Sequence, residues 1–365
     1  MRGQECPVDK IDSRGADTLG GQQIEKMDEL DRYIRQMTFH GLGKEGQRKL
    51  LSSKVLLVGC GALGSAAAVS MVRSGIGHLT IVDRDIPELV NLHRQFLYDE
   101  EDIKAMIPKA IVAAEKLAKM NSQVKIEPKV AELRAENIEK IAQGVHLVID
   151  GTDNLATRYL INDFCVKNSI PWIYGGVIGA SGMMMVVEPG KTACLRCLFP
   201  EPPAPGSLPS CETEGVLNPA PLLIGALESI EAIKILIGSD KVKTGLTNID
   251  LWEHTFSTVE TKRNPHCPTC GKKNFEFLNR KKTDFSTSLC GRNAVQISPA
   301  QVIDLDLQAL KQRLEKLGKI SFNGYLLEAD LEGFKLIIFP DGRAIIQGTT
   351  DETKARSLYN RYLGR

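Results

Sequence analysis

Two pairs of cysteines have the spacing that binds a metal ion. Cys194 and Cys197 form one CxxC sequence, and Cys267 and Cys270 form a second. Each CxxC turn presents two thiolates to one tetrahedral ion, and two turns complete a site with no open position for a catalytic water. The sequence therefore predicts a structural zinc (Zn²⁺) site. Redox dithiols or unrelated buried cysteines are the alternatives.

Cys211 has no CxxC partner. The segment "ACLRCLFPEPPAPGSLPSCETEG" places a proline-rich stretch between Cys197 and Cys211. We therefore expect Cys211 on an irregular surface loop, where an exposed thiol can act as a nucleophile. The alternative is an inert loop cysteine. His266 could replace a metal ligand, but its position directly beside Cys267 favours a bystander.

A glycine-rich turn predicts a nucleotide site. Gly59, Gly61 and Gly64 in "GCGALG" have GxGxxG spacing, follow the apolar "KVLLVG" and open a helical segment. Such glycines let backbone N–H groups and a helix N-terminus approach phosphates. Asp83 ends the next apolar segment, "HLTIVD", where a carboxylate can accept ribose hydroxyls. The alternative is a turn kept for packing.

Further polar residues indicate which reaction the nucleotide undergoes. They are Asn91, Arg94 and Gln95 of "VNLHRQF", Lys109 of "IPKAI", and Asp153 of "GTDN". Stabilising a phosphoryl group while pyrophosphate departs needs several cations, whereas hydride transfer needs few. Taken singly, Arg94 and Lys109 are typical of solvated surface charges, and Asp153 of a helix N-cap. Their combination favours phosphoryl chemistry.

The segments around these residues alternate between strand and helix patterns. This alternation predicts an α/β fold with a Rossmann-like, doubly wound parallel sheet. "GMMMVVEPG", the helix "PAPLLIGALESIEAIKILIG" and "LTNIDLWEHTFSTVETK" predict an antiparallel extension. The expected domains are a disordered extension (1–26), a nucleotide-binding α/β domain (27–278), a linker (279–290) and a C-terminal module of one helix, two or three strands and a second helix (291–365).

The composition excludes several classes of partner. The chain has 365 residues, is 42% hydrophobic and 25% charged, and carries a formal net charge of +1. This balance provides no bulk attraction to nucleic acid or to an acidic membrane surface. No apolar run approaches the roughly 20 residues of a membrane span, and the N-terminus lacks a secretory signal pattern. We expect a cytoplasmic protein whose clustered cysteines bind metal or act in catalysis.

The motifs together resemble one known family. "RYIRQ", "GCGALG", "IVDRD", "NLHRQ", "PK", "TDN", "CLRC", "CETEG" and "CPTC" occur in the order of the ThiF/MoeB family, from about residue 28 to 272. These proteins are bacterial relatives of ubiquitin-activating enzymes. The resemblance implies a homodimer that uses ATP to adenylate the C-terminal Gly-Gly carboxylate of a ubiquitin-like sulfur carrier protein.

The resemblance also implies a role for each motif residue. Gly59, Gly61, Gly64 and Asp83 would hold adenosine, while Asn91, Arg94, Gln95 and Lys109 match positions that contact phosphate. Asp153 matches an aspartate linked to Mg²⁺, Cys211 an active-site cysteine, and Arg35 an arginine that extends into the partner subunit's site. On the sequence alone, Arg35 is one charge on an amphipathic helix.

The C-terminal module gives an indication of the pathway. It resembles the extension of ThiF-type proteins of Bacillus-like bacteria, which favours a ThiS-like carrier and thiamin thiazole synthesis over a MoaD-like carrier and molybdopterin. The sequence shows no rhodanese-like segment after the shared motifs, so sulfur would come from a separate persulfide donor. Two other functions remain open: an NAD-dependent oxidoreductase with structural zinc, and a non-catalytic docking module for a ubiquitin-like protein.

Overall fold

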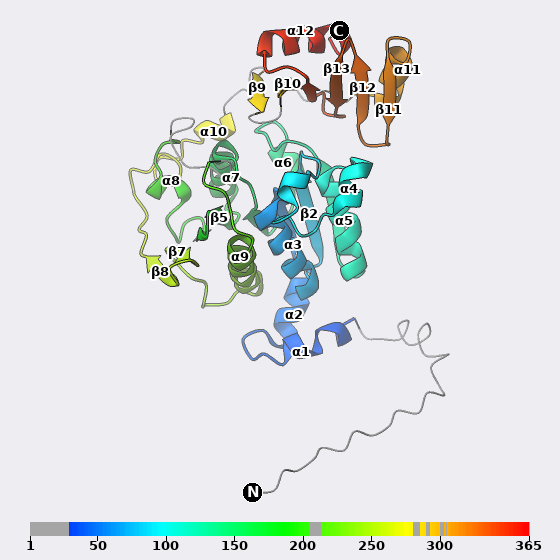
Figure 1. Cartoon of the computed structure of the whole chain (residues 1–365). Helices are drawn as coiled ribbons and strands as arrows, with labels where there is room; N and C mark the ends of the chain where they lie inside the picture. The colour runs from blue at the N-terminus through cyan, green and yellow to red at the C-terminus, as the bar shows by residue number, and fades with distance from the viewer. Residues whose placement is uncertain are drawn as a thin grey trace, which may run out of the picture.

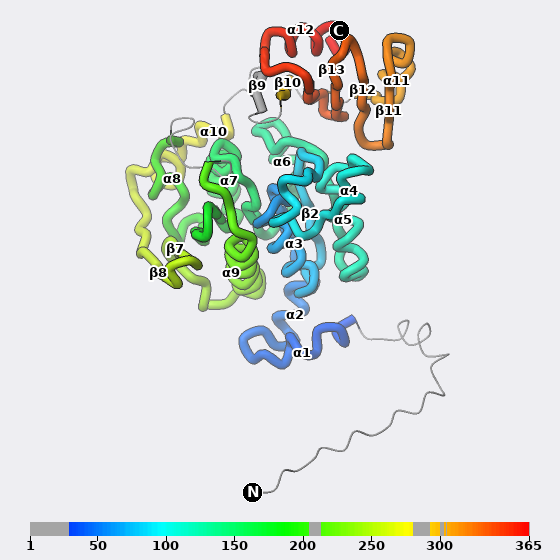
Figure 2. The backbone as a smooth tube through the Cα atoms, in the orientation of Figure 1, coloured from blue at the N-terminus to red at the C-terminus, as the bar shows by residue number. Residues whose placement is uncertain are grey.

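Two β-sheets organise the chain, one of eight strands and one of six. A computed structural model describes residues 29–203, 213–279, 285–289, 293–299, 303 and 305–364. We call the eight-stranded sheet with its helices the large unit, and the six-stranded sheet with its two helices the C-terminal unit. In Figure 1 the C-terminal unit, yellow to red, lies at one end of the large unit. Figure 2 traces the same path as a backbone tube.

The first five strands of the large sheet are parallel, in the order β3-β2-β1-β4-β5. They are β1 (Lys54–Val58), β2 (His78–Asp83), β3 (Lys125–Val130), β4 (Leu147–Asp150) and β5 (Trp172–Ile178). The order of these strands is typical of doubly wound sheets. The Rossmann-like fold that the sequence predicts is therefore confirmed.

Helices cover both faces of this sheet, which explains why β1 is apolar along nearly its whole length. The helices are α3 (Ala62–Ser74), α5 (Lys109–Met120), α7 (Leu155–Asn168) and α9 (Pro219–Ile237). Val55 and Leu57 of β1 pack in the core formed with α3, α5 and α9. Leu56 and Val58 point the other way and pack with α7.

An antiparallel extension completes the large sheet, as predicted. It consists of β6 (Ser181–Val187), β7 (Leu246–Asp250) and β8 (Thr255–Val259). α9 lies against β5 and β6 and also against α3. The contact between the two helices is close at Gly225, where an added Cβ would lie 2.6 Å from Ala66 Cβ. Only a residue without a side chain allows this approach.

Short helices at the start of the described chain pack at the edge of the sheet opposite the glycine turn. They are η2 (Asp31–Tyr33), α1 (Ile34–Met37) and α2 (Gly43–Leu51). Tyr33 lies over Gly75 at the end of α3, where an added Cβ would lie 2.4 Å from Tyr33 Cζ. Arg32 Nη1 donates to the carbonyl of Met120 at the end of α5, over 3.0 Å.

The C-terminal unit has more strands than the sequence predicts. It contains β9 (Phe285–Leu289), β10 (Ala294–Ser298), α11 (Leu307–Leu314), β11 (Lys319–Phe322), β12 (Leu327–Leu331), β13 (Phe334–Ile338), β14 (Ala344–Gln347) and α12 (Glu352–Tyr362). β9 lies inside the segment 279–290, which we expected to be a linker, and pairs with β10. Its sequence FSTSL is largely hydroxylated, so it lacks the apolar run that identifies a strand. The other expected domain boundaries stay predictions.

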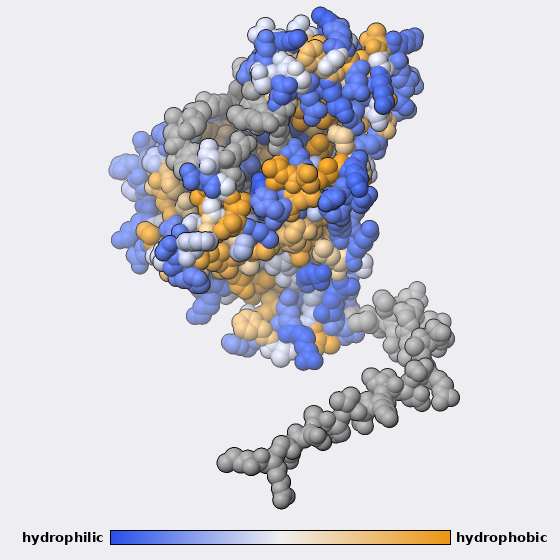
Figure 3. Space-filling model, in the orientation of Figure 1, coloured by the Kyte–Doolittle hydropathy of each residue, from blue (hydrophilic) through white to orange (hydrophobic). Residues whose placement is uncertain are grey.

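The remaining elements are short. They are η3 (Leu89–Asn91), α4 (Glu100–Ala105), α6 (Ile138–Ile141), α8 (Leu195–Leu198) and α10 (Glu276–Asn279). None of the helices in the described ranges is long and apolar enough to cross a membrane. Figure 3 shows a largely hydrophilic C-terminal unit, with apolar side chains gathered below it on the visible face of the large unit. The expected disordered segment 1–26 lies outside the described residues.

Gly225→Ala is expected to lower the free energy of unfolding by about 1–3 kcal/mol, because the new methyl group overlaps Ala66 Cβ and forces α3 and α9 apart. Ala226→Val is the matched control, since it adds volume at an exposed position of the same helix and costs roughly 0.6 kcal/mol of helix propensity. Urea unfolding monitored by circular dichroism measures both. A Gly225→Ala protein as stable as wild type would contradict the close helix contact.

Candidate active site

The glycine turn joins the end of β1 to the start of α3 and lies against the end of β4. Gly59 has a φ of +84°, and an added Cβ there would lie 2.7 Å from the carbonyl oxygen of Gly151. An added Cβ at Gly64 would lie 2.0 Å from the carbonyl oxygen of Gly59. No side chain caps the N-terminus of α3. The first N–H groups of this helix are therefore available to an anion.

The carboxylate of Asp83 holds this turn. It accepts the backbone N–H of Cys60 over 2.7 Å and that of Asp85 over 2.8 Å. Burial raises the pKa of Asp83, and the nearby charge of Lys109 opposes that shift. Burial likewise raises the pKa of Cys60 to about 12. The Cys60 thiol is therefore neutral, as is usual for a small buried packing residue.

Lys109 brings a buried positive charge to the carboxyl end of β2. Only 5% of the residue is exposed, and its Nζ lies 3.8 Å from Asp85 Oδ2. Its backbone N–H donates to the Asp85 carbonyl over 2.8 Å. Burial opposes the charge, but nearby carboxylates, led by Asp85 and Asp83, outweigh it and raise the pKa of Lys109. Lys109 is therefore cationic at neutral pH.

The NLHRQ segment lies beside the turn. Arg94 Nη2 donates to Asn91 Oδ1 over 2.7 Å, and its Nη1 donates to the carbonyl of Val90 over 3.1 Å. Gln95 is buried, and its Nε2 would lie 3.5 Å from a Cβ added at Gly61. Within the described residues, Gln95 Oε1 is buried without a hydrogen-bond partner. An orphaned acceptor next to the glycine turn fits a site that a polar ligand completes.

Asp153 comes after β4 at the carboxyl end of the sheet. The N-cap of α7 is Asn154, whose Oδ1 accepts the N–H of Thr157 over 3.3 Å, so Asp153 does not have the capping role considered as its alternative. The Asp153 side chain is exposed and makes no hydrogen bond or ion pair with any residue in the described ranges. Its carboxylate is therefore free to meet a ligand.

A buried ion pair that was not predicted from the sequence lies beside the loop that carries Asp153. Arg158 Nε donates to Asp150 Oδ2 over 2.8 Å, and its Nη2 donates to the carbonyls of Thr152 and Gly175 over 2.6 and 2.7 Å. The guanidinium also lies over the Tyr174 ring, 5.0 Å from its centre. Two features of the sequence could have indicated this pair. Asp150 is an acid at the end of an apolar strand, and Arg158 lies in the helix that follows. The pair fixes the loop that carries Asp153.

Arg35 lies far from the other predicted site residues. It is exposed on α1, which packs beside Tyr33 at the distal end of α3. The 13 residues of α3 separate this end from the glycine turn, a helix length of about 20 Å. Figure 1 shows α1 and the C-terminal unit at opposite ends of the large unit. Arg35 therefore does not reach the site of its own chain.

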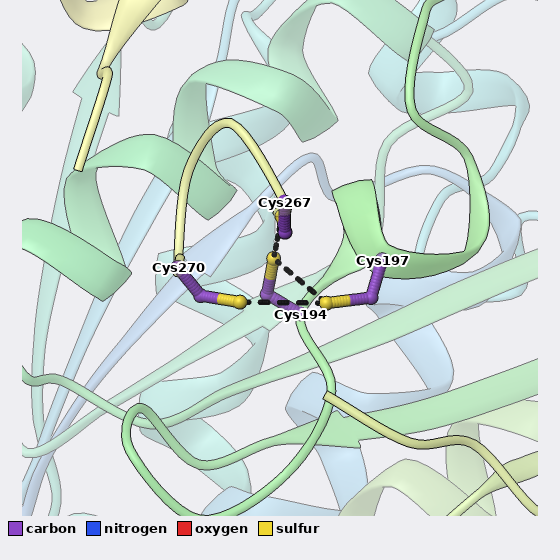
Figure 4. A group of neighbouring side chains, drawn as sticks. All are labelled: Cys194, Cys197, Cys267 and Cys270. Carbon is purple, nitrogen blue, oxygen red and sulfur yellow. Dashed lines mark hydrogen bonds between the residues drawn. The ribbon is translucent and has the colours of Figure 1, made fainter. Parts of the chain in front are cut away.

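The two CxxC sequences meet in one four-sulfur cluster (Figure 4). All four Sγ atoms lie within 4.8 Å of one another, and neighbouring pairs are 3.4, 3.5 and 3.9 Å apart. Zinc–sulfur bonds of about 2.3 Å at tetrahedral angles separate sulfurs by about 3.8 Å. Cys197 Sγ also accepts the backbone N–H of Asn264 over 3.4 Å. The cluster can hold one metal ion.

One residue considered as a replacement ligand does not belong to this cluster. His266 is exposed and does not belong to the group of possible ligands. Cys211 lies outside the described residues. The cluster itself is closed, because three of its cysteines are buried and Cys197 is half-buried. Hydrogen bonds from Cys194 and Cys270 lower the pKa of Cys197, whereas hydrogen bonding and burial raise the pKa of Cys194.

Comparison with known proteins identifies the family. The ThiF family matches residues 33–269. The sulfur carrier protein ThiS adenylyltransferase of Bacillus subtilis is 38% identical, over 91% of this chain and 99% of that protein. The sulfur carrier protein adenylyltransferase of Thermus thermophilus is also 38% identical, over 72% of this chain and 97% of that protein. The chain therefore belongs to the ThiF family, as the motifs predict.

Solved structures agree on the fold. A crystal structure of E. coli MccB with ATP matches with a TM-score of 0.58, over 69% of this chain and 77% of that chain, at 22% identity. At this identity the match supports the architecture of the large sheet and its helices. The site residues rest on the geometry described above.

Proposed function

We propose that the protein is an adenylyltransferase that uses ATP to activate the C-terminal Gly-Gly carboxylate of a ubiquitin-like sulfur carrier protein. The observation that carries this proposal is the match with the B. subtilis ThiS adenylyltransferase, which spans 91% of this chain and 99% of that relative. An alignment that covers 91% of the chain must include part of the C-terminal unit. The match therefore favours a ThiS-like carrier and thiamin thiazole synthesis over a MoaD-like carrier and molybdopterin synthesis.

The reaction balances without a redox step. A carboxylate oxygen of the carrier attacks the α-phosphorus of ATP, the bond from that phosphorus to the bridging oxygen breaks, and the acyl adenylate and pyrophosphate form. Catalysis of this kind depends on positioning and on charge stabilisation. No residue needs to change its oxidation state, and nothing in the comparisons favours an NAD-dependent oxidoreductase or a non-catalytic docking module.

Each predicted site residue has a place in this scheme. The N–H groups of the glycine turn and the orphaned Gln95 Oε1 support nucleotide binding, and Asp83 offers a carboxylate to the ribose. Lys109 and Arg94 supply positive charge for the phosphates, with Asn91 orienting Arg94. Asp153 is a suitable ligand for Mg²⁺, which keeps several waters and uses one or two carboxylates. When bound, Mg²⁺ neutralises phosphate charge.

The adenylation proposal is tested by exchange of labelled pyrophosphate into ATP, with ThiS-like and MoaD-like carriers. Asp153→Asn is expected to reduce exchange by about 100-fold or more, because it removes a charged contact of the transition state. Asp240→Asn is the control, since Asp240 is exposed and pairs with its neighbour Lys241. A wild-type protein that shows no exchange with any Gly-Gly carrier would contradict the proposed function. Full exchange in Asp153→Asn would contradict the role of that residue.

We also propose that the four cysteines hold a structural Zn²⁺ ion. Cys267→Ser is expected to lose bound zinc and to lower the melting temperature, because one ligand of a closed site disappears. Cys165→Ala, a buried cysteine outside the cluster, should keep one equivalent of zinc. Elemental analysis by mass spectrometry and differential scanning calorimetry give the two readouts. Wild-type zinc content in Cys267→Ser would refute the ligand assignment.

The position of Arg35 supports a homodimer in which each subunit completes the other's site. Arg35 is exposed and lies at the far end of α3 from the glycine turn of its own chain. In a two-fold dimer, one exposed helix can reach the partner's site while the partner's helix does the same. We propose this arrangement together with a separate persulfide donor, and with Cys211 as a nucleophile toward the activated carrier carboxylate or its sulfur adduct.

Mixed dimers test the role of Arg35. Arg35→Ala and Asp153→Asn homodimers should each be inactive, while a purified heterodimer of the two chains should regain about half of the wild-type exchange rate, because one of its two sites is intact. Pyrophosphate exchange on tagged, separated species measures this. A heterodimer as inactive as both parents would place Arg35 outside the partner's site.

A further inference from the structure

The six-stranded sheet of the C-terminal unit is covered on both faces. α11 and α12 pack on one face, in a core that includes Leu310 and Leu358. The other face presents Leu326, Ile337 and Phe339, which are almost fully buried. These three side chains pack against Ile86, Met106 and Val130 of the large unit. The unit is therefore docked through an apolar contact of its own.

The apolar contact lies beside the loops next to Asp83 and Lys109. Ile86 comes just after Asp83 and Asp85 at the end of β2, and Met106 closes α4 just before Lys109. Val130 ends the neighbouring strand β3. The C-terminal unit thus contacts the loop that follows Asp83 and the turn that precedes Lys109, at the carboxyl end of the parallel strands.

Among the described residues, four hydrogen bonds across the contact end on backbone carbonyls. Arg343 Nη2 donates to the carbonyl of Arg84 over 2.7 Å. Asn323 Nδ2 donates to the carbonyls of Ala105 and Met106 over 3.1 and 2.9 Å. In the reverse direction, Arg134 Nη1 donates to the carbonyl of Pro299 over 2.7 Å. Bonds to the main chain fix the path of a loop whichever side chains it carries.

Arg343 is held rigidly by its own unit. It is fully buried, its Nε donates to Asp341 Oδ2 over 2.8 Å, and its guanidinium lies over the Phe339 ring, 4.2 Å from the centre. The turn PDGR sets its direction, with Gly342 at a φ of +83°. A side chain whose rotamer is fixed on one side can transmit that position to the loop on the other.

The loop that Arg343 holds connects directly to Lys109. Arg84 is next to Asp83 in the chain, and its side chain pairs with Glu132 over 3.2 Å. The next residue, Asp85, accepts the backbone N–H of Lys109 and faces its Nζ. Arg343 therefore supports one end of this assembly, and Asn323 supports the turn at Met106 that leads into Lys109.

We propose that the C-terminal unit positions the loop of residues 84–86 and the turn at residues 105–106, and so sets the affinity of the large unit for the nucleotide. Arg343 and Asn323 are the positioning residues, and the ligand affected is ATP with its phosphates at Lys109. This inference rests on the proposed function, because it takes ATP to be the nucleotide.

Two variants of the full-length protein test the proposal. Arg343→Met removes the donor to Arg84 and keeps an unbranched stem beside Phe339. Asn323→Asp keeps the Oδ1 that accepts the N–H groups of Tyr325 and Leu326 within its own unit. It replaces the donation to the carbonyls of Ala105 and Met106 with repulsion between oxygens. If Arg343→Met fails to fold, the result for Asn323→Asp alone decides whether the positioning role holds. Arg343→Lys is the conservative variant.

Arg361→Met is the matched control. Arg361 is half exposed and pairs with Glu332 within the C-terminal unit, away from the contact with the large unit. The substitution removes a paired arginine from the same unit without touching the loops. All variants are first compared with wild type by far-ultraviolet circular dichroism and thermal unfolding.

Loop mobility and nucleotide affinity are the two quantities to measure. Hydrogen–deuterium exchange of the protein without nucleotide should rise at residues 84–88 and 105–109 in Arg343→Met and Asn323→Asp. Calorimetric titration with ATP should show affinity roughly tenfold lower, with the KM for ATP raised and the KM for the carrier unchanged. Arg343→Lys should lie between wild type and Arg343→Met, and Arg361→Met should match wild type.

The outcomes separate this inference from the proposed function. Folded variants with wild-type exchange at these loops, or with wild-type ATP affinity, would overturn the positioning role while leaving adenylation intact. A wild-type protein that binds no ATP would overturn the proposed function, and the role assigned to Arg343 with it. Greater loop exchange together with weaker ATP binding supports the proposal.

Discussion

The buried carboxylate of Asp83 is the point through which the other parts of the site are joined. Its two oxygens accept N–H groups from the glycine turn and from the start of the next loop. Burying a carboxylate without partners is costly, so these bonds and the charge of Lys109 stabilise it there. The glycine turn, Lys109 and the contact with the C-terminal unit all depend on the position of the end of β2, which the hydrogen bonds of Asp83 fix.

Close backbone packing imposes the second constraint. The carbonyl of Gly59 lies where side chains at Gly64 and Gly151 would have to be. The two ends of one turn and a third position, Gly151, which is distant in sequence, therefore converge on a space that admits no Cβ atom. This crowding brings the ends of β1 and β4 together with the start of α3, and it leaves the N–H groups of α3 facing outward. Sterics and phosphate recognition thus select the same residues.

Much of this could be predicted from the sequence because the signals are local or periodic. The apolar run of β1, the glycine spacing and the CxxC pairs each indicate a physical requirement that a few neighbouring residues satisfy. The cysteine pairs meet as expected, although they are far apart in the chain. Asp153 and Asn154 show the limit of such reasoning, since two adjacent residues can both cap a helix and only the structure shows that Asn154 does.

The parts that could not be predicted depend on long-range contacts or on weak patterns. The sequence FSTSL of β9 lacks the apolar run that indicates a strand, so the pattern predicts a linker there. Its pairing with β10 is visible only in the structure. The buried Asp150–Arg158 pair looked like an ordinary strand end and a helical arginine. Nothing in the sequence around Arg84 points to a donor in the PDGR turn, because the two segments are joined only by folding.

The bond from Arg343 to the Arg84 carbonyl joins residues 259 positions apart. A ribosome adds about 5–20 residues per second, so roughly 10–50 s separate the synthesis of these two residues. The strands β3, β4 and β5 are made within that interval, and the unit that rests on the loops of the sheet is completed after them. The hydrogen bonds from Asn323 and Arg343 to the loops beside Asp83 and Lys109 are therefore the last part of the site that the growing chain can form.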